Sequence, residues 1–330
     1  MMMDVREMRR IVDVVTAGVI PEPAQDAAAR WRGDSIVHVR SSINHIFRLR
    51  LPDKRIGYLR LTPVAQRSQA ALASEIVFIE QAATAGMAVA CPIRPAAGVA
   101  IEAIGDAAHG YHAVVFEELT GHQLAIDLVN EAHMRTWGRS LARLHQVSQT
   151  LAPQPARPSW ESEVHDACAS LPAEETAVAR ILDATLAWLR TLPVDGEEYG
   201  LIHGDAELDN IIWDGARPQL LDFDSCVYAP YALDITIALQ DVWRAGDSER
   251  DTRIEWFSQG YSEIRPLPPT LREDMPRMQR ALGAFKIARL HHAYAHDRLD
   301  SPTDPSDPVW LATMRTRHLT WLANQRAALG

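Results

Sequence analysis

Two short polar stretches decide the fold of this chain: HGDAELDN at residues 203–210 and LDFD at residues 221–224. Asp205 and Asn210 belong to the first stretch, and Asp222 belongs to the second. Between them, two apolar runs flank Asp214-Gly215, a dipeptide typical of a tight hairpin turn. A short hairpin at this place is expected to bring the three polar side chains close together.

These three side chains meet the needs of phosphoryl transfer from a nucleotide. One carboxylate has to orient the attacking hydroxyl group and accept its proton, and Asp205 is the candidate for this base. An amide oxygen and a second carboxylate have to hold Mg²⁺ against the phosphates, which makes Asn210 and Asp222 the candidate ligands. Asp and Asn are also common in ordinary turns. The spacing, with the second Asp at hairpin distance, favours the catalytic interpretation.

The sequence before this region predicts a small lobe built mainly of strands. A leading helix and one inserted helix are expected at residues 8–15 and 72–79, from apolar residues at helical spacing. Strands of an antiparallel sheet are expected at residues 36–39, 43–49, 56–61, 89–94, 99–104 and 112–118. We therefore expect residues 1–117 to form the smaller lobe.

The sequence after residue 117 is mainly helical. Helices are expected at residues 131–148, 178–189, 231–245, 249–262, 270–299 and 308–328. Strand character returns only briefly, at residues 201–202 and in the hairpin of residues 211–221. Residues 118–330 are therefore expected to form a larger helical lobe, and the fold class is α+β with two lobes.

The motifs around Asp205 and Asp222 resemble the signature of the aminoglycoside phosphotransferase family, which includes homoserine, choline and methylthioribose kinases and shares the protein-kinase fold. The resemblance implies a protein-kinase-like fold with ATP between the lobes. It makes Asp205 the catalytic base, and Asn210 and Asp222 the magnesium ligands. His203 belongs to the same catalytic motif and is expected to buttress the loop instead of reacting.

The resemblance also implies roles for Asp224 and Asp234, two further acids of the larger lobe. Asp224 stands where a second metal ligand could lie, although it could equally cap the following turn. Asp234 matches a family residue that hydrogen-bonds the backbone of the catalytic loop, so it is expected to give structural support.

The resemblance extends to the smaller lobe. Arg60 is expected to bind the ATP phosphates in place of the usual kinase lysine, with Glu75 of the inserted helix as its ion-pair partner. Without the resemblance, Arg60 would be an ordinary exposed strand residue and Glu75 part of a solvated helix face. No GxGxxG loop is present, and the turn that ends at Asn44 takes its place over the phosphates. Glu117 and Leu119 belong to the linker expected to bind the adenine edge through backbone groups.

The phosphate acceptor is expected to be a small molecule with a hydroxyl group. An aminoglycoside-like antibiotic, an amino alcohol, a hydroxy amino acid and a sugar all remain possible. Glu207 and Asp209 lie in the catalytic loop, where they are either solvated or bind a cationic substrate group. Oligomeric state and the choice between ATP and GTP remain open.

Two other classes of protein would share these motifs. A protein serine/threonine kinase of the stress-response type would usually carry a glycine-rich loop and a long activation segment, and here Tyr228-Ala229-Pro230-Tyr231 follows Asp224 almost at once. A non-catalytic nucleotide-binding module would be expected to have lost Asp205 or Asp222.

Composition excludes several classes of partner. The net charge of −10 argues against nucleic-acid binding, and no stretch approaches the ~20 apolar residues that span a bilayer. The three cysteines are scattered and form no CxxC pair, which indicates reduced thiols. A soluble, cytoplasmic protein is therefore expected. Lys54 and Lys286 are its only lysines, so a cation that binds phosphate has to be an arginine in most positions.

Overall fold

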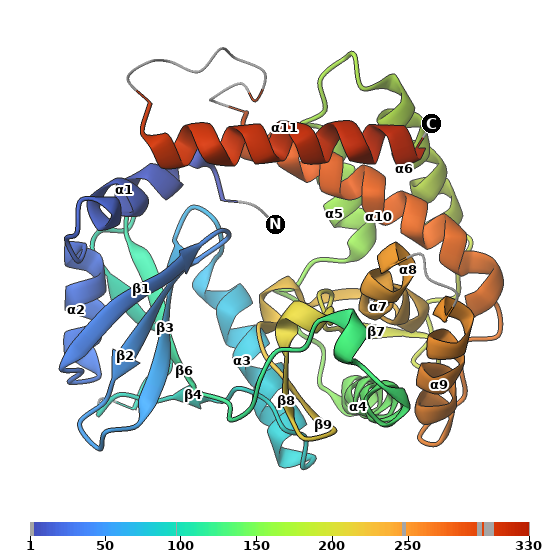
Figure 1. The fold of residues 1–330 in the computed structure, drawn as a ribbon, viewed down its shortest axis with the longest axis horizontal. Coiled ribbons are helices and arrows are strands. Elements are labelled where there is room, and N and C mark those ends of the chain that lie inside the picture. Colours follow the sequence, from blue (N-terminus) through green and yellow to red (C-terminus); the bar gives the residue numbers. More distant parts are fainter. Residues whose placement is uncertain (1–2, 97, 246–248, 296–298, 300–306, 330) are drawn as a thin grey trace.

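The computed structural model describes residues 3–96, 98–245, 249–295, 299 and 307–329. The first part of the chain forms a six-stranded antiparallel sheet, drawn in blue to green in Figure 1. Its order is β1-β2-β3-β6-β4, and β5 also pairs with β6. The strands are β1 (Ser35–Ser41), β2 (His45–Arg50), β3 (Ile56–Pro63), β4 (Pro92–Ile93), β5 (Glu102–Ile104) and β6 (Tyr111–Glu117). The predicted antiparallel sheet is confirmed.

Three helices accompany this sheet: α1 (Val5–Thr16), α2 (Glu22–Arg30) and α3 (Gln69–Thr84). The predicted leading and inserted helices correspond to α1 and α3. Helix α2 is absent from the sequence-based prediction, which took Pro21 and Pro23 as the end of α1. In the structure Pro21 is the N-cap of α2 and Pro23 lies in its first turn, where proline removes no intrahelical hydrogen bond.

The two faces of the sheet have different tasks. Alternate residues of β2 and β3, including Phe47, Leu59 and Leu61, are buried in a core shared with α1 and α2. Because side chains alternate along a strand, Arg60 points to the opposite face, toward α3. The sheet therefore turns one face to its own core and presents Arg60 on the other.

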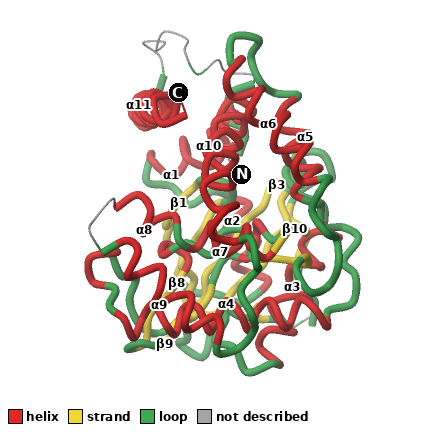
Figure 2. Tube along the Cα trace, turned by 90° about the vertical axis from the view of Figure 1, so that its right-hand side faces the viewer, coloured by secondary structure: helices red, strands yellow, loops and turns green. Residues whose placement is uncertain are grey.

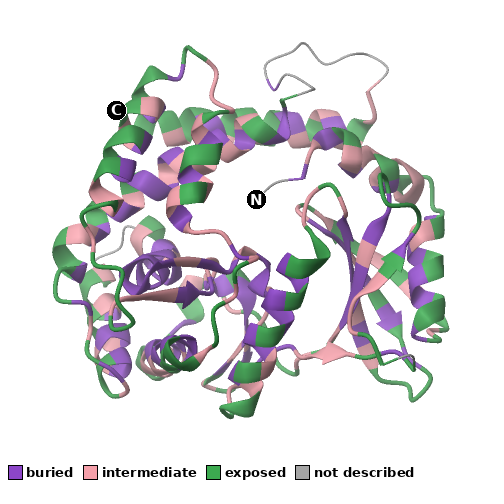
Figure 3. Cartoon of the chain, turned by 180° about the vertical axis from the view of Figure 1, so that it is seen from behind, coloured by how far each residue is buried: buried purple, intermediate pink, exposed green. Residues whose placement is uncertain are grey.

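The second part of the chain is mainly helical and contains two small sheets. Its helices are α4 (Glu131–Thr150), α5 (Trp160–Cys168), α6 (Thr176–Leu189), α7 (Tyr231–Ala238), α8 (Gln240–Ala245), α9 (Arg250–Ser262), α10 (Leu271–Ala293) and α11 (Val309–Leu329). Strand β7 (Tyr199–Ile202) pairs with β10 (Val227–Pro230), and β8 (Ile211–Asp214) pairs with β9 (Arg217–Leu220). All eight residues of α7 are buried. Figure 3 shows the buried residues of this part of the chain in purple.

Most predicted elements of this part are present, with differences at their ends. The hairpin around Asp214-Gly215 is formed by β8 and β9. Helix α5 and strand β10 were not predicted, and the helix predicted at 231–245 is divided into α7 and α8. Helix α10 ends at Ala293, earlier than the predicted residue 299, and residues 296–298 lie outside the described part of the chain. The proposed division into lobes at residue 117 remains a prediction.

Helix α11 connects the two ends of the molecule. It runs from above α1 to above α10 in Figure 1, and Figure 2 shows it nearly end-on beside α10. At one end the indole of Trp310 donates a hydrogen bond to Asp13 of α1 at 2.8 Å. At the other end Arg326 is ion-paired with Glu175, the residue before α6. Across the described residues, none of the helices combines the length and apolar character that a membrane span requires.

Candidate active site

The catalytic loop begins where β7 ends and is held by a carboxylate from α7. Asp234 accepts hydrogen bonds from the backbone N–H groups of His203 and Gly204, each at 3.0 Å, and His145 of α4 lies 3.0 Å from the same carboxylate. Asp234 is fully buried, and although burial acts to raise its pKa, the hydrogen bond from His145 and these contacts lower it. Gly204 has a φ of 77° and no room for a Cβ, since Ser225 O would lie 2.3 Å away.

His203 is engaged on both sides of its ring. Nδ1 accepts a hydrogen bond from the Asp205 N–H at 3.3 Å, and Nε2 donates to the Leu221 carbonyl at 3.1 Å. The ring also packs against Phe223, with centroids 4.4 Å apart. A fully buried imidazole with both nitrogens occupied joins the two predicted motifs and has the geometry of a buttress.

Asp205 and Asn210 are brought together by the short helical turn Leu208–Asn210. The Asn210 amide nitrogen donates to the Asp205 carboxylate at 2.9 Å and to the Asp205 carbonyl at 2.8 Å. With its nitrogen committed to Asp205, Asn210 has its amide oxygen to offer as a ligand. Burial, and then the nearby negative charge of Glu207, raise the pKa of Asp205.

Asp222 lies directly beyond the hairpin, in a left-handed backbone conformation with φ 61° and ψ 63°. This conformation is costly for a residue other than glycine, and such strain is concentrated at functional sites. Its carboxylate faces two arginines of the six-stranded sheet, Arg40 at 3.1 Å and Arg60 at 3.9 Å. Burial, and then the charge of Asp224, raise the pKa of Asp222.

Asp224 has cationic partners of its own. Arg67 contacts its carboxylate at 2.9 Å and 3.1 Å, and the guanidinium of Arg157 donates to its backbone carbonyl at 2.5 Å. Burial acts to raise the pKa of Asp224, but Arg67, Arg60 and Arg157 outweigh it and hold the pKa well below its usual range. The carboxylate is 2% exposed, so its role as a second metal ligand remains a prediction.

The donor set of the site fits Mg²⁺ together with phosphates. Within the described ranges, no group of three His, Cys, Asp or Glu side chains converges on a point that could hold a metal ion alone. An amide oxygen from Asn210 and a carboxylate from Asp222 are hard oxygen donors. Mg²⁺ is commonly bound by one or two carboxylates plus substrate phosphates, so the two residues suit a metal that arrives with a nucleotide.

The six-stranded sheet places a buried cation near the Asp222 carboxylate. Arg60 of β3 forms two parallel hydrogen bonds to Glu75 of α3, at 2.8 and 2.9 Å. Both side chains are buried, and the guanidinium also lies 4.8 Å from the centroid of the Phe116 ring. Arg60 is therefore no ordinary exposed strand residue, and Glu75 no solvated helix residue. The assignment of Arg60 to ATP phosphates remains a prediction.

The other residues predicted for the nucleotide lie around the same sheet. Asn44 is buried directly before β2 and accepts a hydrogen bond from Thr62 at 2.7 Å, which fixes the end of the turn between β1 and β2. Glu117 ends β6, and its N–H donates to the Cys91 carbonyl at 2.9 Å. Leu119 follows in the linker. Their contacts with a nucleotide remain predictions.

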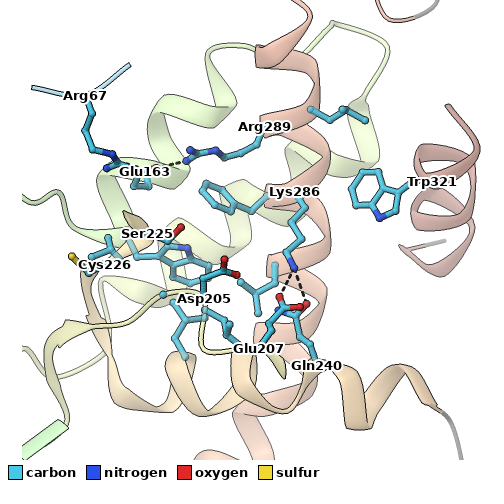
Figure 4. A pocket seen from close by; sticks show the side chains of 18 of the residues that line it. Arg67, Glu163, Asp205, Glu207, Ser225, Cys226, Gln240, Lys286, Arg289 and Trp321 are labelled. Atoms are coloured by element: carbon cyan, nitrogen blue, oxygen red, sulfur yellow. Dashed lines mark hydrogen bonds and ion pairs between the residues drawn. The ribbon is translucent and has the colours of Figure 1, made fainter. Parts of the chain in front are cut away.

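A cavity of about 420 Å³ lies beside Asp205 (Figure 4). Apolar and aromatic side chains from α5, α7, α10 and α11 form most of its wall, and Figure 4 shows Trp321 of α11 on one side and Arg67 on the other. Asp205 and Gly204 belong to its lining, whereas Asp222 and Arg60 do not. Asp205 therefore links this cavity to the candidate magnesium ligand Asn210, to which its carboxylate is hydrogen-bonded.

Glu207 and Asp209, the two acids suggested for substrate, point to different places. Glu207 lines the cavity, but Lys286 already contacts it at 2.9 Å and Arg244 at 3.3 Å. Asp209 lies in a separate hollow formed with Asp241 and residues 124–126. A cationic group of a substrate would have to compete with Lys286 for Glu207. Asp209 does not line the cavity, so its carboxylate is not available to a substrate bound there.

These features define a class: a two-lobed, protein-kinase-like fold with a candidate catalytic Asp–Asn loop, a candidate metal ligand at Asp222 and a cavity beside Asp205. The comparison with known families gives the particular family. Residues 40–267 match the model of the phosphotransferase enzyme family, abbreviated APH, and the chain belongs to this family. The expected small-molecule phosphotransferase is confirmed by this match. ATP and Mg²⁺ as its cofactors remain predictions.

Individual relatives cover most of the chain. Amicoumacin kinase from Bacillus subtilis (strain 168) is 26% identical over 283 residues, 82% of this chain and 84% of its own. Homoserine kinase from Methylobacillus flagellatus is 28% identical over 226 residues, 67% of this chain and 69% of its own. The solved structure of the amicoumacin kinase hAmiN, in complex with AMP-PNP, Ca²⁺ and Ami, superposes with a TM-score of 0.78 at 21% identity and covers 96% of this chain and 94% of its own.

Sequence reasoning missed several residues of the site. Arg40, Arg67 and Arg289 are arginines among many, and nothing local distinguishes them. Trp321 belongs to a helix more than 100 residues after Asp205 in the sequence. The one available signal was Lys286, one of two lysines in an arginine-rich chain and a residue of the cavity wall.

Proposed function

We propose that this protein transfers the γ-phosphoryl group of ATP to a hydroxyl group of a drug-sized acceptor, with Asp205 as the general base. The observation that carries the proposal is the position of Asp205. Its carboxylate borders the acceptor cavity, and the same carboxylate is hydrogen-bonded to Asn210, the candidate magnesium ligand. A hydroxyl group in the cavity would meet the base next to the phosphates.

The chemistry asks little covalent work of the protein. Asp205 accepts the hydroxyl proton as the acceptor oxygen bonds to the γ-phosphorus and the bond between this phosphorus and the β–γ bridging oxygen breaks. The raised pKa of Asp205 brings it closer to neutral pH and makes it a stronger base. Mg²⁺ held by Asn210 and Asp222 would neutralise negative charge on the phosphates. Arg60, fixed by Glu75, would orient the phosphate chain.

The cavity favours an acceptor larger than a simple hydroxy amino acid. Its volume of about 420 Å³ lies in the range of pockets that enclose drug-sized ligands. Trp160, Phe285 and Trp321 line it, so an apolar or aromatic body would be well accommodated. The similarity to amicoumacin kinase over 82% of the chain supports the same choice and makes amicoumacin the first compound to test. Homoserine represents the smaller alternative.

An ADP-release assay with Mg-ATP tests the proposal. The panel should hold amicoumacin, aminoglycosides, homoserine, choline, methylthioribose and simple sugars. We expect one larger hydroxylated class to stimulate ADP release, and Asp205→Asn to abolish it while ATP binding persists. Asp209→Asn is the matched control, because this acid lies in the same loop but faces the separate hollow. Stimulation by homoserine alone would contradict the acceptor class, and an active Asp205→Asn variant would contradict the base.

A further inference from the structure

Arg40 of β1 reaches from the six-stranded sheet to Asp222, the candidate magnesium ligand. Its guanidinium nitrogen lies 3.1 Å from the Asp222 carboxylate, across 182 positions of sequence. Arg60 lies farther from the same carboxylate, at 3.9 Å. The Arg40 side chain is half exposed, so no burial forces it into this position. It is therefore the nearer of the two cations that face the candidate magnesium ligand.

A β-bulge lies in β1 directly before this side chain, which points toward Asp222. The pairing of β1 with β2 shifts between His38 and Arg40, so that Val39 is an extra residue in β1. The alternation of burial along β1 is also broken there, because Val39 and Arg40 are both exposed. Bulges next to active sites commonly change the direction of a side chain. The sequence of β1 thus contains a local irregularity at the residue that reaches Asp222.

The surroundings of Arg40 lack the usual means of holding phosphates. The turn that follows it, Ser41-Ser42-Ile43-Asn44, contains no glycine that would let the backbone wrap the phosphate chain. Lys54 lies in the distant hairpin between β2 and β3, and Lys286 is paired with Glu207. An arginine beside this turn can offer a planar, permanently charged fork to phosphate oxygens.

We propose that Arg40 binds the terminal phosphates of the nucleotide and that Asp222 holds the Arg40 side chain near the phosphate site when no nucleotide is bound. When Mg²⁺ takes its place at Asp222, Arg40 is repelled by the metal and attracted by the triphosphate. Its guanidinium would then leave the carboxylate and bind the phosphates. This inference rests on the proposed position of Mg²⁺ at Asp222.

Calorimetric titration with AMP-PNP and with AMP, both in the presence of Mg²⁺, tests the role of Arg40. In Arg40→Gln we expect the affinity for AMP-PNP to fall about tenfold or more, as the loss of a charge-assisted hydrogen bond predicts, and the affinity for AMP to stay unchanged. Arg40→Lys keeps the charge but lacks the planar fork, so its affinity for AMP-PNP should lie between those of the wild type and Arg40→Gln. Arg50→Gln is the matched control, because Arg50 of β2 is equally exposed and is paired with Asp34 at 2.7 Å.

The outcomes separate this inference from the proposed function. AMP-PNP binding by Arg40→Gln that equals or exceeds the wild-type affinity would overturn the inference, because Arg40 would then only occupy Asp222. An equal loss of AMP and AMP-PNP affinity would also overturn it, since the effect would not concern the terminal phosphates. Failure of the wild-type protein to bind AMP-PNP at all would instead remove the nucleotide site on which the proposal depends.

Discussion

The buried pair of Arg60 and Glu75 allows stability and nucleotide binding to be separated. Both side chains are almost inaccessible to solvent, and two parallel hydrogen bonds of 2.8 and 2.9 Å join them. Replacing Glu75 by Leu removes both hydrogen bonds of the buried guanidinium, which keeps the electrostatic attraction of Asp224 and of Asp222, the latter at 3.9 Å. Breaking one side of a buried ion pair costs about 3–5 kcal/mol of unfolding free energy.

The double variant Arg60→Met/Glu75→Leu gives the sharper result. Apolar side chains of similar volume can replace a buried ion pair with little loss, so the double variant should recover most of the stability that Glu75→Leu loses. Its affinity for Mg-ATP should nevertheless stay below that of the wild type, because Arg60 is absent. For a chain of this size, the single variant should melt about 4–7 °C below the wild type.

Thermal unfolding and calorimetric titration with ATP, on the same samples, measure the two effects. A double variant that is stable and binds ATP with wild-type affinity would refute the phosphate-binding role of Arg60. A single Glu75→Leu variant that melts with the wild type would refute the argument from burial. Retention of ATP affinity in Glu75→Leu, despite its lower stability, would assign to Glu75 a purely structural role.

Three further predictions concern the catalytic loop, the cavity and the C-terminal helix. Asp234→Asn should lower the unfolding free energy by about 2–4 kcal/mol in urea denaturation and reduce kcat more than ATP affinity, because the backbone of the catalytic loop loses its charged acceptor. Trp321→Ala should raise the KM of the acceptor but not that of ATP, whereas the exposed Leu319→Ala on the same helix should change neither; an unchanged acceptor KM would contradict the position of the acceptor. Burial acts to raise the pKa of Glu175, but the contacts with Arg326 and His291 together outweigh burial and lower this pKa. These contacts therefore stabilise the fold above pH about 4.5, and their contribution is lost as the pH falls further. Glu175→Gln should therefore reduce the unfolding free energy by about 1–3 kcal/mol at pH 7 and flatten its decline in acid, and a decline as steep as that of the wild type would contradict this.

The residues of the catalytic motifs could be predicted because their arrangement is local. Asp205 and Asn210 are joined by one short turn, and a tight hairpin brings Asp222 beside them. Turn chemistry and the period of a strand are properties of a few consecutive residues, so spacing alone indicates that such side chains meet. The strands of the small sheet could be predicted for the same reason.

Elements whose local pattern is ambiguous were missed. Helix α2 begins at a proline, which the sequence alone could equally use to end the helix before it. Helix α5 and strand β10 are short, and strand β10 gains its hydrogen bonds from β7, which lies more than 20 residues earlier. Tertiary pairing stabilises such segments, and a local pattern contains little information about it.

The sequence by itself determined the fold class and the family and singled out the candidate catalytic and metal-binding carboxylates, because these depend on short-range spacing. Only the tertiary structure decided which charges face one another. It brings Arg40 to Asp222, pairs Lys286 with Glu207 and turns Asp209 away from the cavity. These contacts join residues far apart in the chain, and their formation depends on how sheets and helices pack, which no short stretch of sequence specifies.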